Sequence, residues 1–115
     1  MHFFVETMEE GVDHALHLAA WRGDLPEVQR IITEHPALME LSDGANRSPL
    51  LLAAERGHTA MVEWLLDQGA DMEAQAMNGW DALYVASHGG HTAVVSVLLD
   101  RGLTSTGELS MDGYL

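Results

Sequence analysis

The stretch SPLLLAAERGHTAMVEWLL, residues 48–66, decides the fold because the chain carries two more versions of it. One version is HALHLAAWRGDLPEVQRII, residues 14–32, and the other is DALYVASHGGHTAVVSVLL, residues 81–99. When the three are aligned, the period is 34 residues and then 33, and these residues coincide: Leu16, Leu50 and Leu83; Ala19, Ala53 and Ala86; Gly23, Gly57 and Gly90. Self-similarity at a fixed period of this length indicates a protein built from stacked structural repeats.

Each repeat reads as two short helices joined by a turn. The first helix ends at the shared glycine, because a helix end commonly needs a residue in the left-handed conformation. The second helix carries apolar residues at helical spacing, for example Val62, Leu65 and Leu66. The polar link that follows has Asn78 and Gly79 where a hairpin would have its tip. The sequence therefore predicts an all-α solenoid of three helix-turn-helix repeats with short β-hairpin connections.

The pattern resembles the ankyrin repeat. That family has this period, the signature T-P-L-H-x-A and a glycine that follows it. The signature stands here as SPLLLA, residues 48–53, and more loosely as DALYVA, residues 81–86. Leu51 and Tyr84 occupy the place where the family usually has histidine, and His17 keeps that histidine. Because many positions recur at one period, the resemblance is specific.

The repeat pattern also predicts the organisation of the chain. We expect an N-terminal tail over residues 1–12 and the ankyrin-like domain over residues 13–103, with units of about 13–45, 46–78 and 79–103. Residues 104–115 form either a second tail or the start of a truncated fourth repeat, since MDGYL at their end resembles the hairpin MNGWD of residues 77–81.

The two ends of the predicted array differ in polarity. In the first repeat, Glu27 and Arg30 replace the apolar Met61 and Trp64 of the second repeat. Terminal repeats of a solenoid usually carry polar residues on their outer face. The first repeat therefore reads as an amino-terminal cap. The second helix of the third repeat stays apolar, which predicts an uncovered carboxy-terminal face.

Composition and charge narrow the classes of partner. The 115 residues include 18 acidic and five basic residues, and the net charge is −13. Nucleic acids and anionic membranes are bound by neutralising phosphates with Lys and Arg, so neither is expected as a partner. A protein partner with a basic or mixed-charge surface is favoured instead. There is no cysteine, and we see neither a secretory signal nor a membrane-spanning stretch, so we expect a cytoplasmic or otherwise intracellular protein.

The sequence predicts no catalytic residue, no metal site and no cofactor, and thus no enzyme. His14 and His17, like His88 and His91, are three residues apart, as helical metal ligands can be. A zinc site needs three or four converging ligands, however, and the repeat itself accounts for His17 and His91 as structural residues that bond to nearby backbone. The glycine-rich SHGGH of residues 87–91 resembles some oxyanion loops, but no G-x-S-x-G motif accompanies it.

The resemblance implies where a partner would bind. In the ankyrin family the hairpin tips and the first helices line a concave groove that commonly binds other proteins. The positions of this sequence that match it are Trp21, Arg22, Arg47, Glu55, Arg56, Met77, Asn78, Trp80 and His88. Trp and Arg are enriched at interface hot spots, and the arginines would meet carboxylates or carbonyls of the partner. Alternatively, Trp21 packs against the N-terminal tail and Trp80 against a neighbouring hairpin.

Three hypotheses for the function follow. The first is a protein–protein interaction module that binds its partner through the groove. The alternative is an N-terminal targeting or substrate-recruiting fragment of a larger enzyme whose catalytic domain lies beyond residue 115, which the mass of the native protein would reveal. A third hypothesis is a homodimer through the uncapped face, formed by Val94, Val97 and Leu98, which light scattering would detect.

Overall fold

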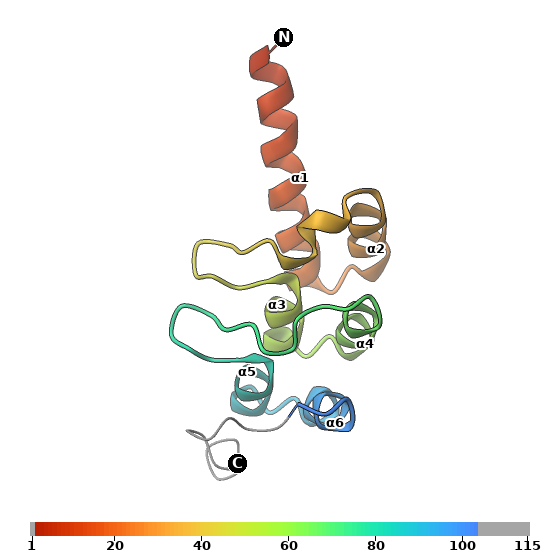
Figure 1. Cartoon of the computed structure of the whole chain (residues 1–115), viewed down its shortest axis with the longest axis vertical. Coiled ribbons are helices and arrows are strands. Elements are labelled where there is room, and N and C mark those ends of the chain that lie inside the picture. Colours follow the sequence, from red (N-terminus) through yellow and green to blue (C-terminus); the bar gives the residue numbers. More distant parts are fainter. Residues whose placement is uncertain (1, 104–115) are drawn as a thin grey trace.

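The computed structural model describes residues 2–103. They form six α-helices and one short 3-10 helix, and that range contains no β-strand: α1 (His2–Arg22), α2 (Leu25–Glu34), η1 (Pro36–Glu40), α3 (Pro49–Arg56), α4 (Thr59–Asp67), α5 (Ala82–His88) and α6 (Thr92–Asp100). Figure 1 shows the C-terminal part of α1, then α3 and α5, following one another down one column, with α2, α4 and α6 in a second column. The predicted all-α repeat solenoid is confirmed.

The helices of each repeat begin and end at residues suited to those places. Ser48 caps α3, its hydroxyl oxygen accepting a hydrogen bond of 3.3 Å from the Leu51 N–H, and Pro49 opens the helix. Asp81 caps α5 in the same way through the Tyr84 N–H, at 2.9 Å. Gly57 ends α3 with a φ of 78°, the left-handed conformation that glycine adopts without a steric penalty.

Histidines link successive repeats. His58 donates from Nε2 to the Trp21 carbonyl at 2.8 Å, and His91 donates to the Glu55 carbonyl at 2.9 Å. These carbonyls lie in the last turns of α1 and α3, where the helix itself provides no donor. The ring of His58 also fills the space above Gly23, since a Cβ there would lie 2.6 Å from its Nδ1. The expectation that the histidines bond to backbone is thus confirmed.

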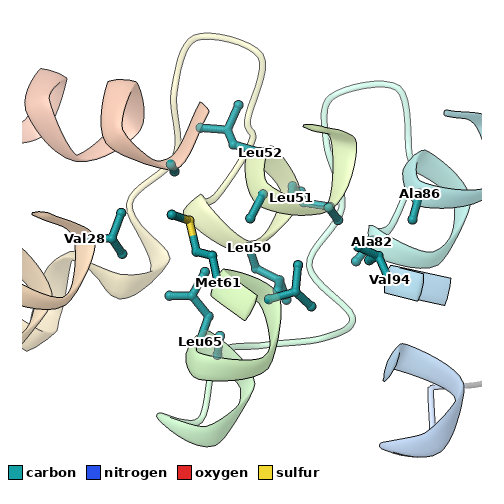
Figure 2. Close-up of a cluster of buried hydrophobic side chains, with 14 of the residues drawn as sticks. Val28, Leu50, Leu51, Leu52, Met61, Leu65, Ala82, Ala86 and Val94 are labelled. Carbon is teal, nitrogen blue, oxygen red and sulfur yellow. The ribbon is translucent and has the colours of Figure 1, made fainter. Parts of the chain in front are cut away.

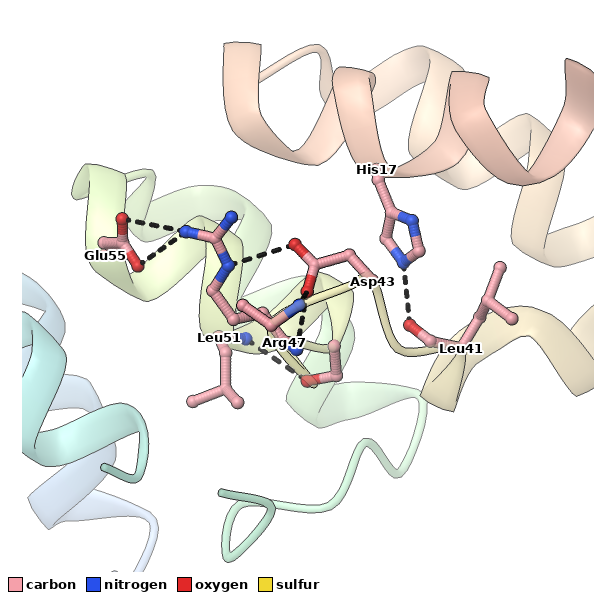
Figure 3. Close-up of polar contacts among 8 residues, drawn as sticks. His17, Leu41, Asp43, Arg47, Leu51 and Glu55 are labelled. Carbon is pink, nitrogen blue, oxygen red and sulfur yellow. Dashed lines mark hydrogen bonds and ion pairs between the residues drawn. The ribbon is translucent and has the colours of Figure 1, made fainter. Parts of the chain in front are cut away.

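His17 has the same role within the first repeat. Its Nε2 donates to the Leu41 carbonyl at 2.8 Å, which ties α1 to the loop after η1 (Figure 3). The predicted structural role of the signature histidine is therefore confirmed for the one repeat that keeps it.

A continuous apolar core runs between the two columns of helices. Leu50, Met61 and Leu65 are buried at the middle of the array and lie beside Val28 of the first repeat (Figure 2). Ala53 and Ala86 are also buried, and their small side chains let neighbouring helices approach closely. Trp64 is partly buried against this core. Burial of each large aliphatic side chain stabilises the fold by about 2 kcal/mol.

Two features of the chain differ from the sequence prediction. Helix α1 begins at His2 and runs unbroken into the first repeat, through the residues expected to form a separate tail. The connections have the shape of hairpins but contain no regular strand in the described range. Besides one bond inside the turn, each is closed across its base by one backbone bond, from the Asp43 N–H to the Arg47 carbonyl at 3.0 Å and from the Ala76 N–H to the Trp80 carbonyl at 2.9 Å. A single bond of this kind makes a turn but not a ladder.

The ends of the array also differ from each other. On the outer side of α2, Arg30 pairs with Glu27 at 2.8 Å and with Glu34 at 3.4 Å, in keeping with a polar cap. At the other end, Val94 and Leu98 are fully buried in α6. The predicted dimer surface is therefore wrong for these two side chains, because they already pack inside the chain. The predicted tail or fourth repeat at 104–115 lies outside the described residues.

Candidate functional site

A groove of about 350 Å³ opens between the two hairpin loops and the C-terminal ends of α3 and α5. Figure 1 shows both loops projecting from the same side of the molecule. The lining residues are Ala45, Arg47, Glu55, Ala76, Met77, Asn78, Trp80, Val85, His88 and Gly89. Six of the nine residues predicted from the sequence are among them. The other three, Trp21, Arg22 and Arg56, lie beyond the amino-terminal end of this groove.

The hairpin turns that form one wall are held rigidly. The Gly79 N–H donates to the Ala76 carbonyl at 2.8 Å, and Gly79 has a φ of 85°. In the preceding turn Asn46 takes this left-handed position with a φ of 62°, which asparagine tolerates better than most residues. The Met77 N–H donates to the Ala45 carbonyl at 2.9 Å and so joins one turn to the next. The groove wall is therefore preformed.

Aromatic side chains form the carboxy-terminal end of the groove. The ring of Trp80 lies 4.3 Å from that of Tyr84 and 5.2 Å from that of His88, measured between centroids. Trp80 is half-buried and its ring packs on α5 of its own repeat. Sequence reasoning missed Tyr84, although the spacing of four residues from Trp80 to Tyr84 to His88 places the last two on one helical face.

An ion-pair cluster occupies the middle of the groove. The Nε of Arg47 lies 3.0 Å from Oδ2 of Asp43, and its Nη1 lies 3.3 Å from both carboxylate oxygens of Glu55 (Figure 3). The cluster ties the first hairpin to α3. Arg47 is therefore already paired with two carboxylates of the chain, and its partner-binding role stays a prediction.

The ionisation of Asp43 reflects this cluster. Burial is the largest single effect and acts to raise the pKa of Asp43, but several effects that lower it outweigh burial together. The backbone N–H groups of Arg47 and Ala45 donate to the carboxylate at 2.8 and 2.9 Å, and the Arg47 guanidinium adds attraction. The pKa of Asp43 is consequently lowered, and the charged form holds the turn.

The three predicted residues outside the groove form a separate patch. Trp21 is 36 % exposed, and the guanidinium carbon of Arg56 lies 4.3 Å from the centre of its ring. The corresponding atom of Arg47 lies 5.8 Å from the same ring. Two cations of the following repeat thus lie near the ring of Trp21, which stays partly exposed to solvent. Arg22 is exposed at the end of α1.

A cleft larger in volume than this groove lies elsewhere. A cleft of about 430 Å³ separates α1 from η1 and is lined by Val12, Asp13 and residues 35–38. It has no tryptophan, tyrosine or arginine, the residue types that most often anchor protein interfaces. Within residues 2–103 no group of three His, Asp or Glu side chains converges as metal ligands would. No helix in that range is both long and apolar enough to span a membrane.

Comparison with known proteins agrees with the repeat geometry. A family model described as "Ankyrin repeats (3 copies)" matches residues 16–106, and the chain belongs to the ankyrin repeat family. Ankyrin repeats are generally protein–protein interaction modules, and proteins built from them are typically not enzymes.

Three relatives show how the repeats are distributed among longer proteins. The chain is 40 % identical over 79 residues to mouse "Ankyrin repeat and SAM domain-containing protein 6", covering 68 % of this chain and 9 % of that protein. It is 37 % identical over 71 residues to the "Transient receptor potential cation channel subfamily A member 1 homolog" of Caenorhabditis elegans, covering 62 % and 6 %. Human "Ankyrin repeat and SOCS box protein 1" is 30 % identical over 90 residues, covering 72 % and 27 %. The chain therefore spans a small part of each relative.

Proposed function

We propose that this chain binds an extended segment of a protein partner in the groove between the hairpin loops and α3 and α5. The observation that carries the proposal is the exposed apolar rim of that groove. Met77 is 78 % exposed beside the half-buried Trp80, with Val85 at the groove floor. A large methionine left in solvent next to an aromatic ring is the kind of surface that proteins use for adaptable contacts.

The rigidity of the groove supports this proposal. Both turns are fixed by backbone bonds and by bonds from the backbone to side chains. One example is the bond from the backbone N–H of Trp80 to Oδ1 of Asn78, at 3.1 Å. A preformed surface loses little conformational entropy when it binds, so more of the contact energy appears as affinity. The helix ends behind the groove are held by His91, whose bond to the Glu55 carbonyl fixes the last turn of α3.

Charge supports a partner with a basic or mixed-charge surface. The net charge is −13, and three of the five arginines are already paired within the chain: Arg30, Arg47 and Arg101. Acidic residues therefore dominate the long-range field, which attracts cationic proteins and repels polyanions such as nucleic acid. The proposal involves no catalysis and no cofactor.

Selection of peptides from a displayed random library tests the proposal. We expect peptides that bind the wild-type chain and that bind Met77→Ser about tenfold more weakly, because an apolar side chain at the rim is lost. Leu99→Ser is the matched control, since Leu99 is also an exposed apolar residue, 38 % accessible, but lies on α6 outside the groove. It should retain the affinity within twofold. A library that yields no binder, or binders insensitive to Met77→Ser, contradicts the proposal.

A further inference from the structure

We propose that the groove receives an arginine side chain of a basic peptide, with the guanidinium between the ring of Trp80 and the carboxylate of Glu55. This inference rests on the proposed function and specifies the chemistry of the partner. Both residues line the same groove, and neither is fully buried. Arginine is the side chain that combines stacking on an aromatic face with hydrogen bonds to a carboxylate.

The chain already makes both of these contacts with its own arginines. At the amino-terminal end, Arg56 lies over the ring of Trp21, 4.3 Å from its centre. In the middle of the groove, Arg47 pairs with Glu55 through Nη1 at 3.3 Å. Among the described residues, no arginine lies over Trp80, whose ring therefore offers the contact that Arg56 supplies to Trp21.

The charges in the groove favour a cation. Asp43 and Glu55 are two carboxylates facing the single guanidinium of Arg47, so the cluster keeps one negative charge. A carboxylate has about four lone-pair sites, and the single Nη1 of Arg47 does not use all those of Glu55. The side chain of Glu55 is 33 % exposed, which leaves it open to a second donor. An acidic side chain at the same place would be repelled.

The shape of the groove suits the stem of an arginine as well as its head. Arginine buries its methylene chain along apolar surface while its guanidinium reaches a polar partner. Met77 at the rim and Val85 at the floor provide apolar contacts for the methylenes. Trp80 stays in place for the guanidinium because its ring is backed by Tyr84, 4.3 Å away.

A titration with a defined peptide tests the inference. The probe is Ac-SGRGRGS-NH2, and its control replaces both arginines by citrulline, which has the same shape without the charge. Binding is followed through the 13C-methyl resonance of Met77, which remains present in every variant. We expect a saturable shift with a dissociation constant on the order of millimolar for the arginine peptide, and binding at least fivefold weaker for the citrulline peptide.

Matched tryptophan variants locate the contact. Trp80→Leu keeps an apolar side chain but removes the aromatic face, so it should weaken binding of the arginine peptide about fivefold. Trp21→Leu is the control at the other tryptophan and should change the affinity less than twofold. Thermal melting of both variants verifies that they are folded.

Three outcomes would overturn the inference. They are equal binding of the citrulline and arginine peptides, no saturable shift up to about 10 mM peptide, and a loss in folded Trp21→Leu that matches the loss in Trp80→Leu. If library peptides still bind through Met77 in any of these cases, the proposed function stands and only its arginine specificity is lost. If they do not, the proposed function fails as well.

Discussion

The first and third repeats place equivalent backbone positions in different surroundings. Above Gly23 of the first repeat lies the ring of His58, whereas a Cβ at Gly90 of the third repeat would meet no atom of residues 2–103 within 4 Å. Ile32 is 5 % exposed in the first repeat, and its equivalent, Leu99, is 38 % exposed in the third. In the first repeat, these positions are covered by the second repeat that packs against them.

The same difference separates the two tryptophans that the sequence predicts as partner-binding, Trp21 and Trp80. The ring of Trp21, which is 36 % exposed, carries the guanidinium of Arg56 from the second repeat, while the half-buried Trp80 lines the groove with aromatic rings behind it. Family resemblance alone gives both tryptophans the same status. We propose that Trp21 contributes to the contact between the first two repeats through Arg56, and that the third repeat uses Trp80 for binding.

The largest expected effect compares the two glycines. Gly23→Ala should lower the free energy of unfolding by about 2–4 kcal/mol, because the left-handed φ of 83° and the contact with His58 both resist a Cβ. Gly90→Ala has a similar φ of 76° but open space, so about 1 kcal/mol is expected. Urea denaturation measures both. Equal losses would show that the covering histidine contributes nothing.

A smaller effect is expected for the histidines. His58→Ala should cost about 1–2 kcal/mol, because it leaves the Trp21 carbonyl without its donor. His88→Ala, at an exposed position in the third repeat, should change stability by less than about 0.5 kcal/mol. Chemical denaturation of the pair checks this order. A larger loss for His88→Ala would mean that the contact of His88 with Trp80 stabilises the fold more than the bond of His58 to the preceding repeat.

The two hairpins provide a pH-dependent comparison. Ala76 occupies in the second turn the place that Asp43 has in the first, so Asp43→Ala makes the turns alike. The loss should be about 1 kcal/mol at neutral pH. Because the folded pKa of Asp43 is lowered, its contribution is complete above the unfolded value of about 3.9 and disappears as the pH falls through the lower folded value.

Denaturation of wild type and Asp43→Ala from pH 7 down to pH 2 measures this dependence. The difference between them should shrink only in the acid range. A difference that is constant with pH would show that the carboxylate charge has no part in holding the turn.

The smallest effect is expected on the outer face of the first repeat. Arg30 pairs with Glu27 and Glu34, and these pairs lower the pKa of Glu27 and raise that of Arg30. The pairs are exposed to solvent, where such interactions are largely screened. Arg30→Ala should therefore leave the urea midpoint unchanged within error, at low and at high salt. A clear, salt-dependent decrease of the urea midpoint would contradict this expectation, because it would show that the ion pairs of the cap stabilise the fold.

Much of the fold could be predicted from the sequence because the repeat fixes local structure. Gly57, Ser48 and His58 recur, or have close equivalents, at one period, and each has a local physical task that the structure confirms. The start of α1 could not be predicted in this way, since no repeat constrains residues 2–12. The absence of strands in residues 2–103 reflects hairpins that are closed across their base by one backbone bond each.

The sequence could predict which residues lie at the candidate site, but not which of them form ion pairs with one another. The period places Arg47, Glu55 and Trp80 on the groove side, and the groove contains all three. It does not say that Arg47 is held by Asp43 and Glu55, because that pairing depends on how the first hairpin folds against α3. Side-chain contacts between repeats, such as Arg56 on Trp21, need the stacking geometry as well as the period.

The three tryptophans allow the most direct test of the account. Each has an indole N–H that gives one signal in a 1H–15N correlation spectrum: Trp21 under Arg56, Trp64 partly buried against the core and Trp80 in the groove. A peptide selected from the library is titrated into the labelled wild-type chain. The account predicts a saturable shift of the Trp80 signal while the signals of Trp21 and Trp64 stay in place. A shift of Trp21 or Trp64 with Trp80 unmoved would contradict it.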